Sequence, residues 1–268
     1  MSRPSRGVDV DLDPADVAPT EAVSPNAEHA SRLSSRVRAQ TDFDAIADEY
    51  DQSLPAHVVE HYLRKRLAFI RRHTEPGLTL DLGSGTGLLA ERVADAGYVV
   101  VALDPSRGML SQLRRRRPDL PAVTASGPAL PFPDGTFSLT YCIAVMHHVA
   151  EPDAVRRTLA EMARVTRPGG RVMVWDHNPR NPYWPLLMKR VPQDTGAERL
   201  IPEAEIVDGL RAAGAPTLSS SQLGLVPDFA PRSLLPLVAA IERAVEAIPG
   251  LRRLCAHNVV LAAKVAAP

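Results

Sequence analysis

Residues 78–87 read LTLDLGSGTG and constrain the fold of this chain more than any other stretch. A short apolar run reaches an acid, Asp81, and a turn follows that contains Gly83, Gly85 and Gly87. A helical sequence, LLAERVADAG, begins directly after the turn. Glycines permit positive φ angles and let a ligand approach the backbone, and a helix start offers free N–H groups. The stretch therefore predicts a strand, a tight turn and a helix of the Rossmann type that bind a ligand.

The spacing of the glycines indicates which ligand the turn suits. A dinucleotide fingerprint has the pattern G-x-G-x-x-G, but Leu88 stands where its third glycine would fall, and the third glycine is Gly87. An NAD-dependent oxidoreductase is therefore disfavoured. An acid two residues before the first glycine suits an ammonium group. For this stretch taken alone, a strand–turn–helix without any ligand is the alternative.

Three further stretches follow the glycine turn in order: YVVVALDPSRGML at 98–110, ALPFPDGTFSLTYCIAVMHHV at 129–149 and EPDAVRRTLAEMARVTRPGGRVMVWD at 151–176. With the turn, they resemble the class I S-adenosylmethionine-dependent methyltransferases, and among these the type 11 methyltransferase domain family. The resemblance is strong over residues 42–176 and weaker toward the C-terminus. It implies S-adenosylmethionine as the cofactor, with its amino-acid tail and ribose held at the turn.

The resemblance also implies a set of cofactor contacts. Asp104, at the tip of the second strand, would accept hydrogen bonds from two ribose hydroxyls; the alternative is a helix N-cap. Pro105 and Met109 would offer apolar surface to the adenine. Tyr50 would shield the sulfonium end, or else anchor its helix. The full expected set is Tyr50, Asp81, Gly83, Ser84, Gly85, Gly87, Asp104, Pro105, Met109, Ser126, Gly127 and Ile143.

Two serines depart from the family pattern. The family usually has an acid where ASGPALPF holds Ser126, and that acid bonds the adenine amino group; a serine accepts this bond less strongly. An acid is also usual where TFSLTY holds Ser138, a change that we expect to affect structure more than binding. These departures support one alternative, a regulatory or scaffold protein that binds the cofactor without transferring a methyl group.

Histidines are the candidates for catalysis. Methyl transfer depends largely on alignment, and a base is needed only if the acceptor must lose a proton. His147 and His148 follow the fourth predicted strand and His177 follows the fifth, so each could act as the base or form structural hydrogen bonds. Because the first two are adjacent, we expect only one of them to face a given pocket. His57 and His61 are expected on the face of a helix.

Strands and helices alternate along the chain, which predicts an α/β fold with a doubly wound, mainly parallel sheet. The resemblance implies seven strands, the last antiparallel. Residues 1–40 lack aromatic residues and are expected to be a disordered tail. Residues 41–75 are expected to form an N-terminal helical cover, and residues 76–268 the methyltransferase domain with a helical insertion near 230–250. Strands are predicted at 78–82, 98–103, 121–125, 137–143, 170–176, 216–224 and 257–265. Helices are predicted at 55–73, 86–96, 106–116, 152–167 and 202–213.

The composition narrows the expected partners. The chain has 31 basic and 31 acidic residues among 268, a balance that gives no electrostatic argument for nucleic acid or for an acidic membrane. No apolar run has the length of a membrane span, and no secretory signal is evident, so we expect a cytoplasmic protein. Cys142 and Cys255 lie far apart and outside any Cys/His cluster, so neither a disulfide framework nor a metal site is expected.

The sequence therefore predicts an enzyme that transfers a methyl group from S-adenosylmethionine to O, N or C of a small or lipophilic metabolite. The stretches YWPLLM and LVPDFAPRSLLPLV suggest an apolar acceptor pocket or its cover, with ordinary core packing as the alternative. No signal specifies an oligomeric state.

Overall fold

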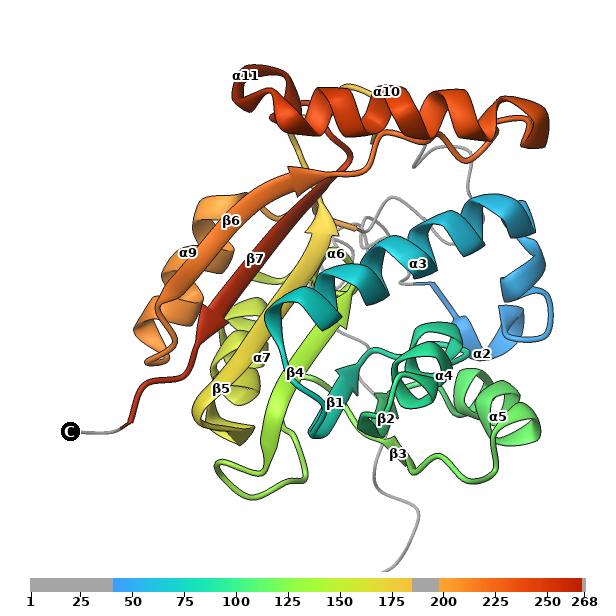
Figure 1. Ribbon diagram of the computed structural model, residues 1–268. Helices are drawn as coiled ribbons and strands as arrows, with labels where there is room; N and C mark the ends of the chain where they lie inside the picture. The colour runs from blue at the N-terminus through green and yellow to red at the C-terminus, as the bar shows by residue number, and fades with distance from the viewer. Residues whose placement is uncertain (1–40, 185–197, 267–268) are drawn as a thin grey trace, which may run out of the picture. The chain divides into compact units, whose positions relative to one another are not determined.

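The computed structural model in Figure 1 describes residues 41–184 and 198–266. The expected disordered tail at residues 1–40 lies outside the described residues, as does the second half of the YWPLLM stretch. Every predicted strand is nevertheless within them.

A seven-stranded sheet forms the centre of the described chain, in the order β3-β2-β1-β4-β5-β7-β6. Its strands are β1 Leu78–Leu82, β2 Val99–Asp104, β3 Ala122–Thr124, β4 Phe137–Ile143, β5 Thr166–His177, β6 Thr217–Leu223 and β7 His257–Ala263. The ladders from β3 to β5 are parallel, and β7 runs antiparallel to both of its neighbours. The predicted fold class, a doubly wound sheet with its last strand antiparallel, is confirmed.

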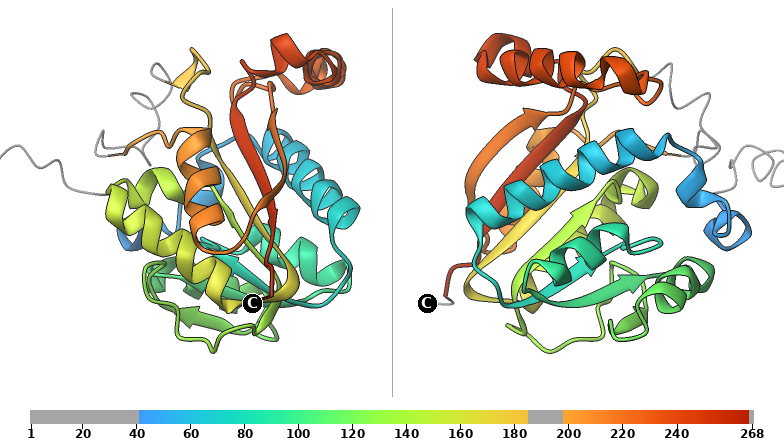
Figure 2. Two further views of the ribbon diagram at one scale, coloured as in Figure 1. Left: turned by 90° about the vertical axis from the view of Figure 1, so that its left-hand side faces the viewer. Right: turned by 45° about the vertical axis from the view of Figure 1, so that its right-hand side comes forward.

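Helices cover both faces of the sheet, as Figure 2 shows, because the inner strands are apolar on both faces. The helices are α3 Ala56–His73, α4 Leu88–Asp95 and α5 Arg107–Arg116 on one face, and α7 Pro152–Val165 and α9 Glu203–Ala212 on the other. Each face has its own core: Leu63, Val93 and Leu110 belong to the first cluster, and Leu159 and Ile206 to the second.

Strand β5 begins earlier than predicted. It starts at Thr166 rather than at residue 170, and α7 ends at Val165. The reason lies in the backbone of the PGG segment, which the sequence indicates as a turn. Gly169 N donates to Lys264 O at 2.8 Å, and Lys264 N donates to Gly170 O at 3.0 Å. Pairing with the chain beyond β7 thus draws this segment into the strand.

The remaining elements lie near the carboxyl ends of the parallel strands, where ligands bind in such sheets. They are α2 Phe43–Ile46, the 3-10 helix η1 Tyr50–Gln52, α6 Met146–Val149, the 3-10 helix η2 Arg232–Leu234, α10 Leu235–Ala247 and α11 Pro249–Arg252. Figure 1 shows α10 lying across the ends of β5 and β6. Within the described ranges, no helix is both long and apolar enough to cross a bilayer.

Candidate active site

Two adjoining cavities lie at the carboxyl ends of β1, β2 and β4. The larger has a volume of about 480 Å³ and the smaller about 460 Å³. Their linings share six residues, so the two cavities are continuous. These residues are Tyr50, Gly83, Gly85, Ile143, Ala144 and His148.

The glycine turn between β1 and α4 forms the junction of the two cavities. Leu103 O accepts hydrogen bonds from Gly83 N at 2.7 Å and Ser84 N at 3.0 Å, which fixes the turn against β2. At Gly85 the φ angle is +55°, and a Cβ atom would meet no atom within 4 Å. The turn therefore presents bare backbone to open space at this residue. Gly87 was expected among the cofactor contacts but lines neither cavity. It packs against α5 instead, where a Cβ would lie 2.5 Å from Leu113 Cδ1.

The smaller cavity brings together the residues expected to hold a nucleoside. Asp104, Pro105, Met109, Ser126 and Gly127 all line it. The two oxygens of Asp104 accept hydrogen bonds from Gly85 N and Ser106 N, each at 2.8 Å. A carboxylate oxygen has a second lone pair, so Asp104 retains acceptor capacity toward the cavity. The N-cap of α5 is Ser106, whose side chain accepts from Met109 N.

The two serines that depart from the family pattern have different surroundings. Ser126 lines the smaller cavity and is exposed. Ser138 lies away from both cavities, and its Oγ donates to Leu78 O at 2.8 Å, which links β4 to β1. Its contacts are therefore structural.

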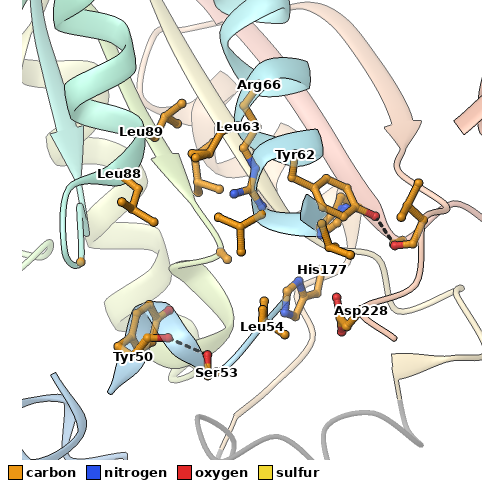
Figure 3. Close-up of a pocket in the computed structure, with 18 of the residues that line it drawn as sticks. Tyr50, Ser53, Leu54, Tyr62, Leu63, Arg66, Leu88, Leu89, His177 and Asp228 are labelled. Carbon is orange, nitrogen blue, oxygen red and sulfur yellow. Dashed lines mark hydrogen bonds between the residues drawn. The ribbon is translucent and has the colours of Figure 1, made fainter. Parts of the chain in front are cut away.

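Opposite charges enter the larger cavity near the glycine turn. Burial raises the pKa of Asp81 to about 7, against the opposing effects of Tyr141 and Arg66. Arg66 extends from α3 toward the cavity, beside Leu63 and Tyr62 (Figure 3). No ion pair joins Arg66 to another described residue, and its Nε has no hydrogen-bond partner there. Its guanidinium lies over the ring of Tyr62, 5.6 Å from the centroid.

These groups fit the amino-acid tail of S-adenosylmethionine. A zwitterion needs a carboxylate for its ammonium group and a cation for its carboxylate, and Asp81 and Arg66 supply both. The buried Ser84 Oγ has no partner among the described residues and offers a further polar contact. The open space beside Gly85 leaves room for a ligand against the backbone.

A buried histidine–aspartate pair lies at the other side of the larger cavity. His147 Nδ1 lies 2.7 Å from Asp176 Oδ1. Burial alone would raise the pKa of Asp176, but His147 and the N–H groups of His177 and Met146 hold it below its ordinary value. An ionised carboxylate can only accept, so the network assigns the proton to Nδ1 and leaves Nε2 of the neutral ring as the acceptor.

His147 and His148 both line the larger cavity, which corrects the expectation that only one would. Adjacent side chains on a helix such as α6 diverge by only about 100°, and the cavities border this short helix on more than one side. The rings lie 4.0 Å apart. Burial lowers the pKa of His148 to about 3, so this ring is a poor proton acceptor.

His177 also lines the larger cavity, within an aromatic stack. Its ring lies 4.1 Å from that of His147 and 3.7 Å from that of Trp184, with interplanar angles of 20° and 15°. Burial lowers the pKa of His177 well below its ordinary value. His57 and His61 line neither cavity; His57 Nε2 bonds Ala230 O at 2.7 Å.

His147, Asp176 and His177 place ligand atoms within 4.8 Å of one another. Both oxygens of Asp176 already accept N–H groups, since Met146 N lies 2.6 Å from one and His177 N lies 2.6 Å from the other. A metal ion would have to displace these bonds, so the geometry fits a positioned histidine better than a metal centre.

Apolar side chains line much of the remaining wall of the larger cavity. They are Leu54, Val58, Val59, Leu63, Leu88, Leu89, Val226 and Phe229. Asp228 lies at the same end of this cavity as His177 (Figure 3), and burial raises its pKa. Tyr183 and Trp184, from the YWPLLM stretch, also contribute.

Sequence reasoning missed Arg66, Asp228 and His257, which all line the larger cavity. Arg66 lies in the helix over 56–73, which contains several basic residues, and a basic residue in such a helix is usually exposed to solvent. Its place at the cavity was therefore not predicted. Its position one turn after Tyr62 on the apolar stripe is the signal that could have identified it. His257 and Asp228 belong to the C-terminal segments, where no motif is recognisable.

Comparisons with known proteins agree with this geometry. A family model described as a methyltransferase domain matches residues 80–174. A demethylmenaquinone methyltransferase of Renibacterium salmoninarum is 37% identical over 158 residues, which cover 56% of this chain and 65% of that protein. The matched part is thus less than two thirds of that relative's length.

Two further comparisons cover more of the matched proteins. A demethylmenaquinone methyltransferase of Corynebacterium glutamicum is 34% identical over 181 residues, which cover 63% of this chain and 76% of that protein. A solved S-adenosylmethionine-dependent methyltransferase of Thermotoga maritima superposes with a TM-score of 0.62 at 17% identity, over 83% of this chain and 97% of that one. The structural likeness concerns the fold alone.

Proposed function

Because the chain belongs to the class I S-adenosylmethionine-dependent methyltransferases, we propose that it transfers a methyl group from this cofactor to a small, largely apolar metabolite. When bound, the cofactor supplies a methyl group already activated for displacement. What the chain itself has to supply is alignment and, for some acceptors, a proton acceptor.

The smaller cavity is proposed to hold the adenosine and the junction its amino-acid tail. Asp104 would bind the ribose, Ser126 the adenine edge, and Pro105 and Met109 its faces. Asp81 would bind the ammonium group and Arg66 the carboxylate. Gly85 would allow the close approach that this arrangement needs.

The larger cavity is proposed to hold the acceptor, with an apolar body toward α3 and a hydroxyl group toward α6. The apolar wall favours a lipophilic body. The names of the relatives support a hydroxylated aromatic ring with an apolar tail, the chemistry of a demethylated quinol. Such a ring gains nucleophilic character at oxygen or at carbon when its hydroxyl group loses a proton.

His147 is proposed as the group that takes this proton. Its Nε2 accepts the proton from the acceptor hydroxyl, while the Nδ1–H stays bonded to Asp176 at 2.7 Å. The ionised Asp176 stabilises the imidazolium that results and fixes the ring orientation. This buried pair, beside an apolar cavity continuous with the cavity of Asp104, is the observation that carries the proposal.

A methyl-transfer assay tests it. Purified protein is incubated with methyl-labelled S-adenosylmethionine and either a reduced demethylated naphthoquinone with a short isoprenoid tail or a polar amine. We expect label in the quinol and not in the amine. His147→Gln should lower the rate by about 10²–10⁴-fold, the usual contribution of general base catalysis, with cofactor affinity retained. His57→Gln is the matched control, since His57 bonds Ala230 O outside both cavities.

Each failure has its own meaning. A His147→Gln variant with the full rate would remove the base assignment. Label in the amine alone would overturn the acceptor class. A protein that binds the cofactor tightly yet labels neither acceptor would favour the alternative, a non-catalytic regulatory or scaffold protein. The exposed Ser126, which replaces the usual acid, supports this alternative.

A further inference from the structure

An apolar ridge runs along α10 and α11. Six of the ten large hydrophobic side chains that are exposed in the described chain lie between residues 234 and 254. Leu237, 60% exposed, and Ile241, 48% exposed, share one face of α10 because they are four residues apart. The whole ridge consists of Leu234, Leu237, Ile241, Ile248, Leu251 and Leu254.

Another face of α10 packs on the body of the protein, through apolar contacts of Leu235 and Val238 and through the acids Glu242 and Glu246. Glu242 is 1% exposed, and its Oε1 lies 2.9 Å from His61 Nε2. Lys65 bonds both Glu242 and Glu246. Glu242 Oε2 accepts from Leu225 N at 2.6 Å. Although burial opposes it, the partners His61 and Lys65 lower the pKa of Glu242 to about 2. These contacts hold α10 against the body of the protein, while the side chains of the ridge are exposed.

The charged side chains of residues 229–256 that do not form an ion pair among the described residues are all arginines. Residues 229–256 contain only two acids, Glu242 and Glu246, and both face inward. The same residues contain four arginines, none of which forms an ion pair with a described residue: Arg232, Arg243, Arg252 and Arg253. An outward apolar ridge with unpaired arginines is the pattern of a helix that lies in the surface of an anionic bilayer.

The ridge adjoins the mouth of the larger cavity. The segment between β6 and η2 supplies Val226, Asp228 and Phe229 to the cavity lining, and Phe229 is 71% exposed. This segment leads through η2 directly into α10. A surface that held the ridge would therefore lie beside the entrance through which an apolar acceptor has to pass.

We propose that the α10–α11 ridge docks on a membrane surface that contains anionic lipids. Docking would place the cavity entrance at the boundary where a lipophilic acceptor is dissolved. In this respect the inference rests on the proposed function, but the docking itself needs neither cofactor nor acceptor. A second copy of the chain is a poorer occupant, because pairing two ridges would bring like-charged arginines together.

Co-sedimentation with vesicles tests the docking. The full chain is mixed, without cofactor, with vesicles of phosphatidylcholine that contain about 30% phosphatidylglycerol, and with vesicles of phosphatidylcholine alone. We expect binding to the anionic vesicles that weakens as salt is added. The double variant Leu237→Asp, Ile241→Asp should bind about tenfold or more weakly, because two inserted side chains are lost. Val265→Asp, at another exposed apolar position, is the matched control.

A second double variant, Arg243→Gln with Arg253→Gln, keeps the apolar ridge and should lose most of the preference for anionic vesicles. Thermal melting and cofactor calorimetry check that each variant is folded. Vesicle binding that is absent in the wild type, or equal in the wild type and the ridge variant, overturns the proposal. So does a dimer, measured by light scattering, that the ridge variant dissociates while no vesicles are bound. Methyl transfer to a detergent-dissolved acceptor in the ridge variant would persist in either case, which separates this test from that of the proposed function.

Discussion

At the scale of single residues, two glycines of one turn have different reasons to be glycine. Both have positive φ angles, but Gly85 faces open space and Gly87 faces Leu113. An alanine costs about 1–2 kcal/mol at either residue through its backbone conformation. Gly87→Ala adds overpacking of about 1–3 kcal/mol, whereas Gly85→Ala places its methyl group where the cofactor is proposed to lie.

We therefore expect Gly85→Ala to lose cofactor affinity with a modest loss of stability, and Gly87→Ala to show the larger drop in melting temperature. Calorimetric titration with S-adenosylhomocysteine and thermal melting measure the two effects. If the Gly85→Ala variant binds S-adenosylhomocysteine as tightly as the wild type does, the proposal that the cofactor lies close to Gly85 is wrong.

Asp81 links stability and binding to pH. Its pKa rises from 3.8 to about 7 on folding, with burial as the main cause. Between these values the folded state binds more protons than the unfolded state, so this residue's contribution to stability falls as pH rises from about 4 to 7 and stays low above. An ammonium group prefers the ionised carboxyl, so cofactor binding should release a proton.

Asp81→Asn is therefore expected to raise the melting temperature at about pH 8 relative to the wild type. In the wild type, cofactor affinity should fall as pH drops below about 7, and the variant should bind weakly without this dependence. Melting curves and calorimetry across that range measure both. An affinity that is flat with pH in the wild type would mean that Asp81 does not meet the ammonium group.

At the scale of elements, we propose that α2, η1 and α3 form a cover over the cavities, and these elements differ in how much they bury. Neither α2 nor η1 contains a buried residue. Polar contacts hold them, among them Asp44 Oδ1 to Gly108 N at 2.7 Å and Asp51 to Thr86 and Arg116. Helix α3, by contrast, buries Leu63 and Ile70 in the core.

Because α2 and η1 bury no residue, they should open readily when no ligand is bound. We expect saturating S-adenosylhomocysteine to slow amide exchange across residues 43–62, because Tyr50 lines both cavities. The amides near Ile70 should exchange slowly with and without the ligand and serve as the internal control. Unchanged exchange at 43–62 would reduce Tyr50 to an anchor for its helix.

The elements themselves were largely predictable from the sequence. Strands β1 and β4 begin and end at the predicted residues, because a run of mostly apolar residues is typical of a parallel strand that is buried on both faces. The start of β5 was not predictable in this way. The PGG segment joins the strand through hydrogen bonds to the chain beyond β7, which is 94 or more residues away. Local sequence carries no signal of such a contact.

The candidate site divides in the same way. Asp104, Met109 and Ser126 were expected together because each follows a strand of a recognisable motif, and they do line one cavity. Arg66 and Asp228 reach the other cavity from α3 and from the segment after β6, and only the packing of these elements shows it. Side chains from elements that carry no recognisable motif are thus the part of the site that sequence patterns do not predict.

At the scale of the whole molecule, the sheet places one continuous cavity at the carboxyl ends of its central strands and the glycine turn divides it. Asp104, Met109 and Ser126 line one half, and Asp81 and Arg66 line the other together with His147, His177 and the apolar wall. His148 lines both halves. We assign the first half to the adenosine, the junction to the amino-acid tail of the cofactor and the rest of the second half to the acceptor, with the docking ridge beside the second.

A crystal structure of the chain with S-adenosylhomocysteine tests this division most directly. This division predicts density for the adenosine in the smaller cavity, beside Asp104 and Ser126. It predicts the amino-acid tail between Asp81 and Arg66, with the sulfur facing His147 across the junction. Density for the nucleoside in the histidine-lined cavity, or none in either cavity at a saturating concentration, would contradict it.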